Sequence, residues 1–341
     1  MGETLRRSRQ LPVLLFMEEK VKKSATAIAM LVFAAACGGV HAQAYPEKTV
    51  RIIVHNAAGT VVDTPPRGVA EALSKIMGQP FIIENRPGAD GFIGTELCAK
   101  AAPDGHTLCS LSQATVTMNQ FYHATMPYDP ERDFAPITYM GTITSALVVH
   151  PSVKAASVRE LVEIARAKPD SLQWATLGNT GAGTLYLEWL KKNASASFYQ
   201  IPYKTNQNGF QAIIAGDAHA MIYPIGPVPA QAKAGKIKVL AVTTTRRWPA
   251  MPGVPTMGES GFDLHFNTWL GFFAPVRTPK EIIGRLNSEI MKIRSDEGFQ
   301  AKFLTTQGIL VEDVNTPEQF AAFIAADRRL VRSLVVVGAQ K

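Results

Sequence analysis

Residues 50–63 read VRIIVHNAAGTVVD, and residues 172–184 read LQWATLGNTGAGT. Each stretch opens with a short apolar run, typical of a strand, and continues into a turn rich in Gly, Ala and Thr. A helix-like segment follows each turn. Because one such strand–turn–helix unit stands in each half of the chain, the pattern predicts an α/β fold with two lobes.

Strand-like and helix-like segments alternate outward from both stretches, and the 341-residue chain is long enough for two domains of ordinary size. This alternation predicts βαβ units and a parallel sheet. The predicted strands are 50–54, 81–84, 107–111, 146–149, 172–175, 198–201, 220–223 and 238–242, and the predicted helices are 67–77, 94–101, 158–168, 185–192, 210–215, 279–292 and 317–337.

The alternation restarts after residues 146–149, which places the border between the lobes there. We expect lobe 1 to comprise residues 45–144 and 269–341, and lobe 2 to comprise residues 145–268. The chain would then cross between the lobes near 141–149 and return near 266–271. The C-terminal helices are expected to pack on lobe 1.

The N-terminal segment has the order of a secretory signal: three lysines between residues 20 and 23, an apolar run over 25–36, then small residues up to Ala44. We expect residues 1–44 to be a signal peptide, with 1–16 an over-long start before Met17, and the protein to be exported. Two alternatives stay open. Residues 25–36 would form a buried core helix, or Cys37 would carry a lipid anchor, which Ala34 disfavours because lipoprotein signals prefer Leu there.

Charge argues against a nucleic-acid partner. The first 44 residues hold six Lys or Arg against three Asp or Glu, so the formal charge of +7 falls to +4 for the remainder. The basic residues of that remainder are scattered and do not cluster with aromatic residues, unlike those of a nucleic-acid-binding surface. A mildly positive field favours anionic ligands.

Two cysteines, Cys98 and Cys109, follow the predicted signal peptide. We expect two small buried thiols rather than a disulfide, because one lies in a helix pattern and the other in a strand pattern, and nothing in the sequence makes them face each other. The disulfide stays open, since an exported protein meets an oxidising compartment. Neither the cysteines nor the seven dispersed histidines have the spacing of a metal site.

Motifs of enzymes and cofactor-binding proteins do not match. Residues 258–262, GESGF, lack the final Gly of a nucleophile elbow, and residues 88–94, GADGFIG, have the wrong glycine spacing for a dinucleotide site. There is no Walker loop and no HExxH pattern. We therefore expect neither catalysis nor a cofactor.

The two glycine-containing turns are the candidate binding elements. Glycines let the backbone approach a ligand, and the N–H groups and dipole of the following helix favour an anion. Gly59 and Gly181 are expected to lie across one cleft, so that the two turns clasp a single molecule. The alternative is that each turn is an ordinary connection. The residues proposed to bind through N–H groups and hydroxyls are Gly59, Thr60, Asn179, Thr180 and Gly181.

Short motifs along nearly the whole mature chain resemble one family. They include ENRPGA at 84–89, APDG at 102–105, YDP at 128–130, DFAP at 133–136, PYK at 202–204 and VPT at 254–256. Their order and spacing are similar to those of the tripartite tricarboxylate transporter substrate-binding family, also called the Bug receptors. The resemblance implies a type II periplasmic-binding-protein fold, with an interlobe cleft that closes on small carboxylates in the periplasm.

The ligand-facing positions depart from the family pattern. The first family loop reads P-F-x-P-G-G-x-x-D, and residues 55–63, HNAAGTVVD, keep only Gly59 and Asp63. The second loop has Thr180 where Gly is usual, Lys204-Thr205 replaces a Lys-Gly pair, and Tyr223-Pro224 replaces an Asp-Asn pair. The resemblance therefore implies the fold more strongly than the ligand. It adds Asp63, Gly178, Tyr203 and Tyr223 to the candidate ligand-binding residues.

The leading functional hypothesis is a receptor that captures a small carboxylate and presents it to membrane transporter subunits through lobe closure. A periplasmic sensor for a signalling receptor is the alternative, and an enzyme is a third. Tyr223, Trp174 and Trp269 suggest an anion with a flat or apolar body, such as an aromatic acid. The opposing interpretation makes Trp174 a buried sheet residue and Tyr223 a space filler.

Overall fold

The computed structural model describes residues 45–178, 181–262, 264 and 266–335. The segment up to Glu47 forms a separate unit, and the fold described below is that of the unit beginning at Lys48. The predicted signal peptide and Cys37 lie outside the described residues.

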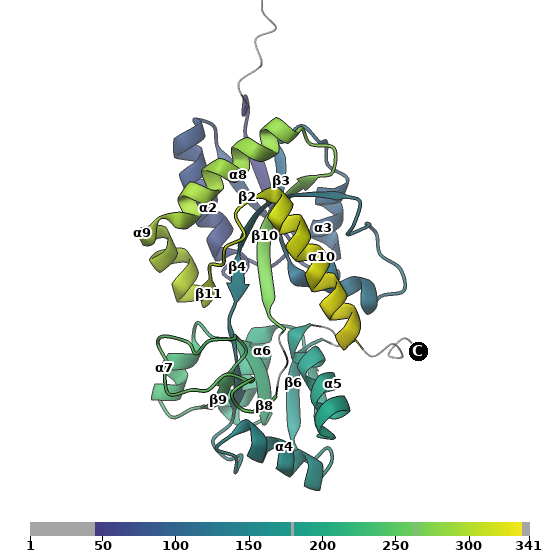
Figure 1. Cartoon of the computed structure of the whole chain (residues 1–341), viewed down its shortest axis with the longest axis vertical. Coiled ribbons are helices and arrows are strands. Elements are labelled where there is room, and N and C mark those ends of the chain that lie inside the picture. The colour runs from purple at the N-terminus through teal and green to yellow at the C-terminus, as the bar shows by residue number, and fades with distance from the viewer. Residues whose placement is uncertain (1–44, 179–180, 263, 265, 336–341) are drawn as a thin grey trace, which may run out of the picture. The chain divides into compact units, whose positions relative to one another are not determined.

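The first sheet has six strands in the order β11-β4-β10-β3-β1-β2 (Figure 1). The parallel strands β1 (Val50–Val54), β2 (Phe81–Asn85) and β3 (Thr107–Ser112) form one side of it. The long strands β10 (Thr268–Pro275) and β4 (Phe134–Ile143) are antiparallel to their neighbours, and β11 (Ile309–Leu310) closes the far edge.

The second sheet has five strands in the order β7-β6-β8-β5-β9. Strands β6 (Gln173–Leu177), β7 (Tyr199–Tyr203) and β8 (Ala220–Pro224) are parallel. Strand β5 (Ser145–Val149) lies antiparallel to both β8 and β9 (Lys238–Val242). Two separate sheets confirm the two-lobed α/β class. The predicted parallel pairing is found among β1, β2 and β3 and among β6, β7 and β8, but each sheet is mixed, because β10 in the first and β5 in the second run antiparallel to both of their neighbours.

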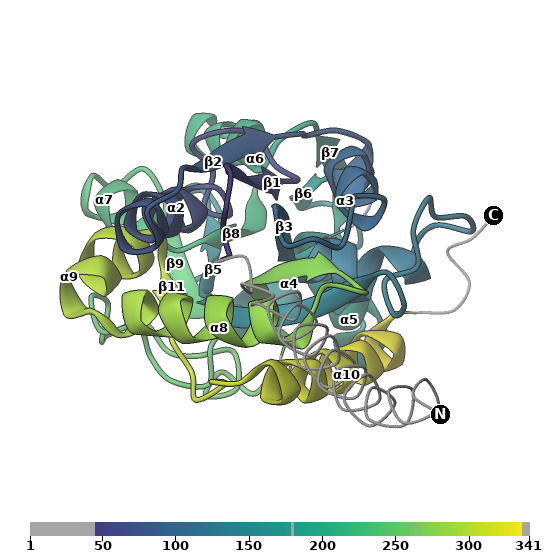
Figure 2. The ribbon, with the colours of Figure 1, turned by 90° about the horizontal axis from the view of Figure 1, so that it is seen from above.

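Helices cover both sheets. On the first sheet, α2 (Thr64–Met77) packs on β2, α3 (Phe92–Ala99) on β1 and β3, and α8 (Lys280–Ser295) and α10 (Pro317–Leu334) on β4. Figure 2 shows α8 running beside α10. The helices around the second sheet are α4 (Val158–Ala167), α5 (Ala182–Ala194), α6 (Asn206–Ala215) and α7 (Val228–Lys233), while α9 (Glu297–Phe299) is a single turn.

Helix α10 contributes to the cores of both sheets. It starts with a capping box between Thr316 and Gln319 and has Pro317 at its first position, which needs no N–H partner. Phe320 packs in the core of the first sheet. Val331 packs in the core of the second sheet, with Leu185 of α5. The helix therefore links the two lobes in addition to the crossing strands.

The outgoing crossing passes through Thr144, which separates β4 from β5. Its N–H donates to the Gly308 carbonyl at 2.8 Å, and its carbonyl accepts from the Ile225 N–H at 3.0 Å. The return crossing leads from β9 to β10, where Thr268 pairs with Ile143. Both crossings therefore lie at one edge of the first sheet.

Cys98 of α3 and Cys109 of β3 form a disulfide, with their Cα atoms 6.1 Å apart. The expectation of two free thiols is wrong, because α3 packs on β3 and places one fully buried cysteine against the other. The bond ties the helix to the sheet.

Candidate functional site

Strand pairing places the first glycine turn beside the crossing. Leu270 at the start of β10 pairs with Ser112, the last residue of β3. Strand β1 is parallel to β3, so its C-terminal end lies at the same edge. The turn after β1, which holds Gly59, Thr60 and Asp63, therefore leaves the sheet at the edge where the chain crosses.

The second sheet has the same arrangement. Ser145, the first residue after the crossing, pairs with Pro224 at the end of β8. Strands β6 and β7 run parallel to β8, so their C-terminal ends lie at this edge as well. Gly178, Gly181, Tyr203 and Tyr223 all stand at or just beyond those ends. Ligands of open α/β sheets bind outside the carboxyl ends of the strands.

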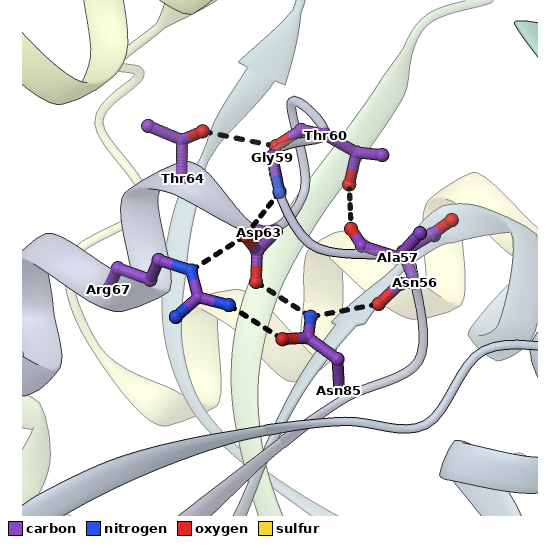
Figure 3. Close-up of polar contacts among 8 residues, drawn as sticks. All are labelled: Asn56, Ala57, Gly59, Thr60, Asp63, Thr64, Arg67 and Asn85. Atoms are coloured by element: carbon purple, nitrogen blue, oxygen red, sulfur yellow. Dashed lines mark hydrogen bonds and ion pairs between the residues drawn. The ribbon is translucent and has the colours of Figure 1, made fainter.

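Asp63 organises the first turn from inside, as Figure 3 shows. Its fully buried carboxylate accepts from the Gly59 N–H, from Arg67 Nε and from Asn85 Nδ2, each at 2.7 Å. Burial raises the pKa of Asp63, but the hydrogen bonds from Arg67, Asn85 and Gly59 and the Arg67 charge outweigh it, so the pKa lies below its ordinary value. Asp63 is therefore ionised at neutral pH, and its carboxylate binds groups of the protein itself.

The remaining polar groups of the turn are also bonded internally. The Thr60 hydroxyl donates to the Ala57 carbonyl at 2.9 Å, and the Thr60 carbonyl accepts from the Asp63 and Thr64 N–H groups. The Gly59 N–H and the Thr60 hydroxyl, both predicted as ligand donors, are therefore occupied in this state. Gly59 has φ 79°, and a Cβ on it would meet no atom within 4 Å, so its outer side is open.

The second turn is similarly open. Gly178 donates its N–H to the Tyr203 carbonyl at 2.9 Å and accepts from the Thr176 hydroxyl. Gly181 precedes α5 with φ 97°, and a Cβ on either Gly178 or Gly181 would have no neighbour within 4 Å. Asn179 and Thr180 lie outside the described residues. The N-terminus of α5 follows this turn directly, and its N–H groups favour an anion.

The predicted aromatic residues divide into two groups. Tyr223 stacks on Phe210 with ring centroids 4.0 Å apart, and its hydroxyl donates to Gln207 Oε1 at 2.7 Å. Burial raises its pKa, so the hydroxyl keeps its proton at neutral pH. Tyr203 lies at the end of β7 and is partly exposed, and its pKa is raised by burial and then by Asp217.

Trp174 and Trp269 belong to the cores, so their interpretation as ligand-facing surface is wrong. Trp174 is fully buried, packs on Phe198 and donates its indole N–H to the Gly183 carbonyl at 3.1 Å. Trp269 is also buried, edge-on to Phe320. Each fills the interior of its own lobe.

Sequence reasoning missed three residues that hold the first turn. Arg67 and Asn85 complete the Asp63 network, and His55 joins the turn to β3 through Ser110 and Ser112. The sequence signal for them was their position in the predicted elements. His55 follows β1, Asn85 ends β2 and Arg67 lies near the start of α2, and the parallel pairing of β1 with β2 brings the C-terminal ends of these strands together. Among the described residues, no group of three or more His, Cys, Asp or Glu side chains is placed to hold a metal ion.

A family model described as the tripartite tricarboxylate transporter family receptor matches residues 66–336. The protein BugT of Bordetella pertussis is 30% identical over 288 residues, which cover 84% of this chain and 88% of BugT. No helix among the described residues is long and apolar enough to cross a membrane.

Two solved structures with named ligands are similar over the fold. Rpa4515 of R. palustris, solved with adipate, has a TM-score of 0.78 and 28% identity, and the match covers 85% of this chain and 97% of that one. MatC of Rhodopseudomonas palustris, solved with bound malate, has a TM-score of 0.76 and 26% identity over 86% of this chain and 100% of MatC.

Proposed function

Because this chain belongs to the tripartite tricarboxylate transporter receptor family, we propose that it is a periplasmic receptor that binds a small organic carboxylate and delivers it to membrane transporter subunits. The observation that supports this most directly is the placement of one glycine turn in each lobe at the sheet edge beside the crossing. The relatives solved with adipate and with malate support the ligand class.

In this proposal the two turns contact opposite ends of one ligand. The second turn and the N-terminus of α5 bind a carboxylate through N–H groups, and Asn179, Thr180 and Gly181 are the residues proposed to contact it. The first turn contacts the other end through backbone on the open side of Gly59, with Thr60 next to it, in the shape that Asp63 imposes. Gly178 supports the second turn through its bond to the Tyr203 carbonyl, and Tyr223 stands near the end of β8, the strand next to β6.

Binding without chemical conversion is part of the proposal. The crossing at Thr144 and the return at Thr268 supply the connections about which two lobes close on a ligand. Closure is the signal that a transporter subunit would read. An N-terminal signal peptide over residues 1–44 would take the protein to the periplasm.

A thermal-shift screen of the mature protein tests the ligand class. A ligand that binds only the folded state at a hundred times its Kd adds about 2.7 kcal/mol of stability, which raises the Tm by about 5 °C or more. We expect such a shift with at least one carboxylate in a panel containing adipate, malate, succinate and benzoate. Amides of the same acids serve as controls and should give no shift.

The preference for an aromatic acid is a finer proposal, and it now depends on Tyr223 alone. Tyr223 lies near the end of β8, the strand next to β6, which leads into the second turn, and its ring stacks on Phe210 of α6. If its edge contacts the ligand, benzoate binds more tightly than succinate or malate, and Tyr223→Ala weakens benzoate binding about tenfold, as expected for a lost aromatic contact of about 1.4 kcal/mol. Titration calorimetry measures both. Equal weakening for aromatic and aliphatic acids, or a preference for succinate, contradicts this proposal.

A further inference from the structure

His55 is the first residue after β1, at the base of the first glycine turn. Its side chain is buried between β3, the start of α3 and the segment that follows β3. Gly91 and Gly94 allow this close packing: a Cβ on Gly91 would come within 2.8 Å of the imidazole, and a Cβ on Gly94 within 2.9 Å of the His55 Cα.

The neighbours of the imidazole determine which nitrogen carries the proton. Nδ1 lies 3.1 Å from the Ser110 carbonyl, which can only accept, so Nδ1 is the donor. Nε2 lies 3.0 Å from the Ser112 hydroxyl and 3.1 Å from the Asn56 Nδ2, which can only donate. This arrangement requires the neutral imidazole with its proton on Nδ1.

Asn56 continues these contacts into the turn. The backbone carbonyl of Asn56 accepts from Asn85 Nδ2 at 2.9 Å. Asn85 Nδ2 also donates to Asp63, whose carboxylate accepts from the Gly59 N–H (Figure 3). One hydrogen-bonded path therefore runs from β3 through His55 and Asn56 to both ends of the turn.

We propose that neutral His55 is a positioning residue that holds the turn of residues 56–63 in its ligand-competent shape through the acceptor nitrogen Nε2. The identification of this turn as a ligand contact rests on the proposed function. Protonation would turn Nε2 into a donor facing the Asn56 amide, so acid would release Asn56 and loosen the turn. Burial, opposed by the Ser110 carbonyl, lowers the pKa of His55 to about 4, which keeps it neutral at pH 7.

Asp63 is the other titratable group on this path, and its pKa lies below its ordinary value because of its bonds to Arg67, Asn85 and Gly59, which outweigh burial. The charged groups around the path form ion pairs. Arg51 and Arg86 bind Glu84, Glu96 binds Lys100, Asp90 contacts His123, and Asp63 binds Arg67. The groups hydrogen-bonded to the imidazole itself are uncharged and come from Asn56, Ser110 and Ser112, and Gly91 lies against the ring.

Two variants of His55 separate positioning from packing. The longer side chain of His55→Gln can place a carbonyl oxygen where Nε2 lies, and this acceptor does not titrate. His55→Asn can reach the Ser110 carbonyl but leaves Asn56 without its acceptor. Amide hydrogen exchange without ligand, expressed as protection factors at pH 7 and pH 4, reports on residues 57–63, with the β6 amides of residues 173–177 as internal control.

We expect His55→Asn to lower protection of residues 57–63 about fivefold at pH 7, as the loss of one net hydrogen bond predicts, and to leave 173–177 unchanged. The wild type should lose protection in the same segment at pH 4, and His55→Gln should not. Nitrogen NMR should show Nδ1–H and a bare Nε2 at pH 7. A proton on Nε2, or wild-type protection in His55→Asn, overturns the proposal. If His55→Asn does not fold, Asn56→Ala removes the same bond from the turn side and must loosen 57–63 alike.

Binding of adipate and malate distinguishes the two proposals. If the wild type binds either acid, His55→Asn must weaken it about fivefold at pH 7, and unchanged affinity overturns the role of His55. If the wild type binds no carboxylate, the proposed function fails, whereas the exchange and NMR results still decide whether His55 positions the turn.

Discussion

Replacement of Asp63 by Ala is expected to destabilise the protein by about 3 kcal/mol and to weaken carboxylate binding about tenfold or more. The variant leaves the Gly59 N–H and the Asn85 amide without their buried acceptor and frees Arg67 from its partner. Because the Gly59 N–H then has no acceptor in the present conformation, the turn is expected to change its shape as well as to lose stability. Chemical denaturation measures the first effect, and calorimetric titration the second.

Arg67→Met is the matched control for this prediction. Arg67 is partly exposed, and its loss removes its bonds to Asp63 and to Asn85 Oδ1 but spares the bonds from Gly59 and Asn85 to Asp63. We expect a cost of about 2 kcal/mol, because Asp63 stays buried and loses its cation but keeps two donors, and we expect a smaller loss of binding than in Asp63→Ala. If Asp63→Ala costs no more than Arg67→Met, Asp63 is not the residue that organises the turn.

Removal of the disulfide by the double variant Cys98→Ala/Cys109→Ala is expected to cost about 3 kcal/mol, the loop-closure value for a short loop. The cysteines are 11 residues apart and fully buried between α3 and β3. Ligand affinity should stay within about twofold, because the Asp63 network does not include either residue. Unfolding followed with and without reductant measures the effect, and the double variant should not respond to reductant.

A thiol assay on the unfolded, exported protein decides the same question chemically. We expect no free thiol before reduction, since exported proteins meet an oxidising compartment. Two free thiols, together with unchanged stability of the double variant, would contradict the disulfide.

The short strands were predicted well, including the wholly buried β3 and β5, whereas two long strands that contain Pro and Gly were not. The predicted strands 50–54 and 238–242 coincide with β1 and β9. In contrast, β4 and β10 were missed, although they join the sheets. Each carries Pro and Gly, which usually mark turns. Gly271 of β10 is explained only by tertiary packing, since a Cβ there would clash with Phe320.

The candidate site was located from the sequence, but the roles of its residues were not. Gly59 and Asp63 stand out by pattern, yet the partners of Asp63 are an arginine one helical turn away and Asn85, which belongs to another strand. Only the register of β1 with β2 brings Asn85 there. Likewise, the sequence does not show whether the side chain of a tryptophan near a glycine turn faces the ligand or the core. The side chain of Trp174 lies in the core.

The central claim is that one chain binds one small carboxylate and returns it unchanged. Calorimetric titration of the mature protein with the acid that gives the largest thermal shift tests it most directly, followed by mass analysis of the recovered ligand. We predict saturable binding with one site per chain, about tenfold or greater weakening in Asp63→Ala, and recovery of the intact acid. Absence of binding across the carboxylate panel, or conversion of the bound acid, would contradict the account.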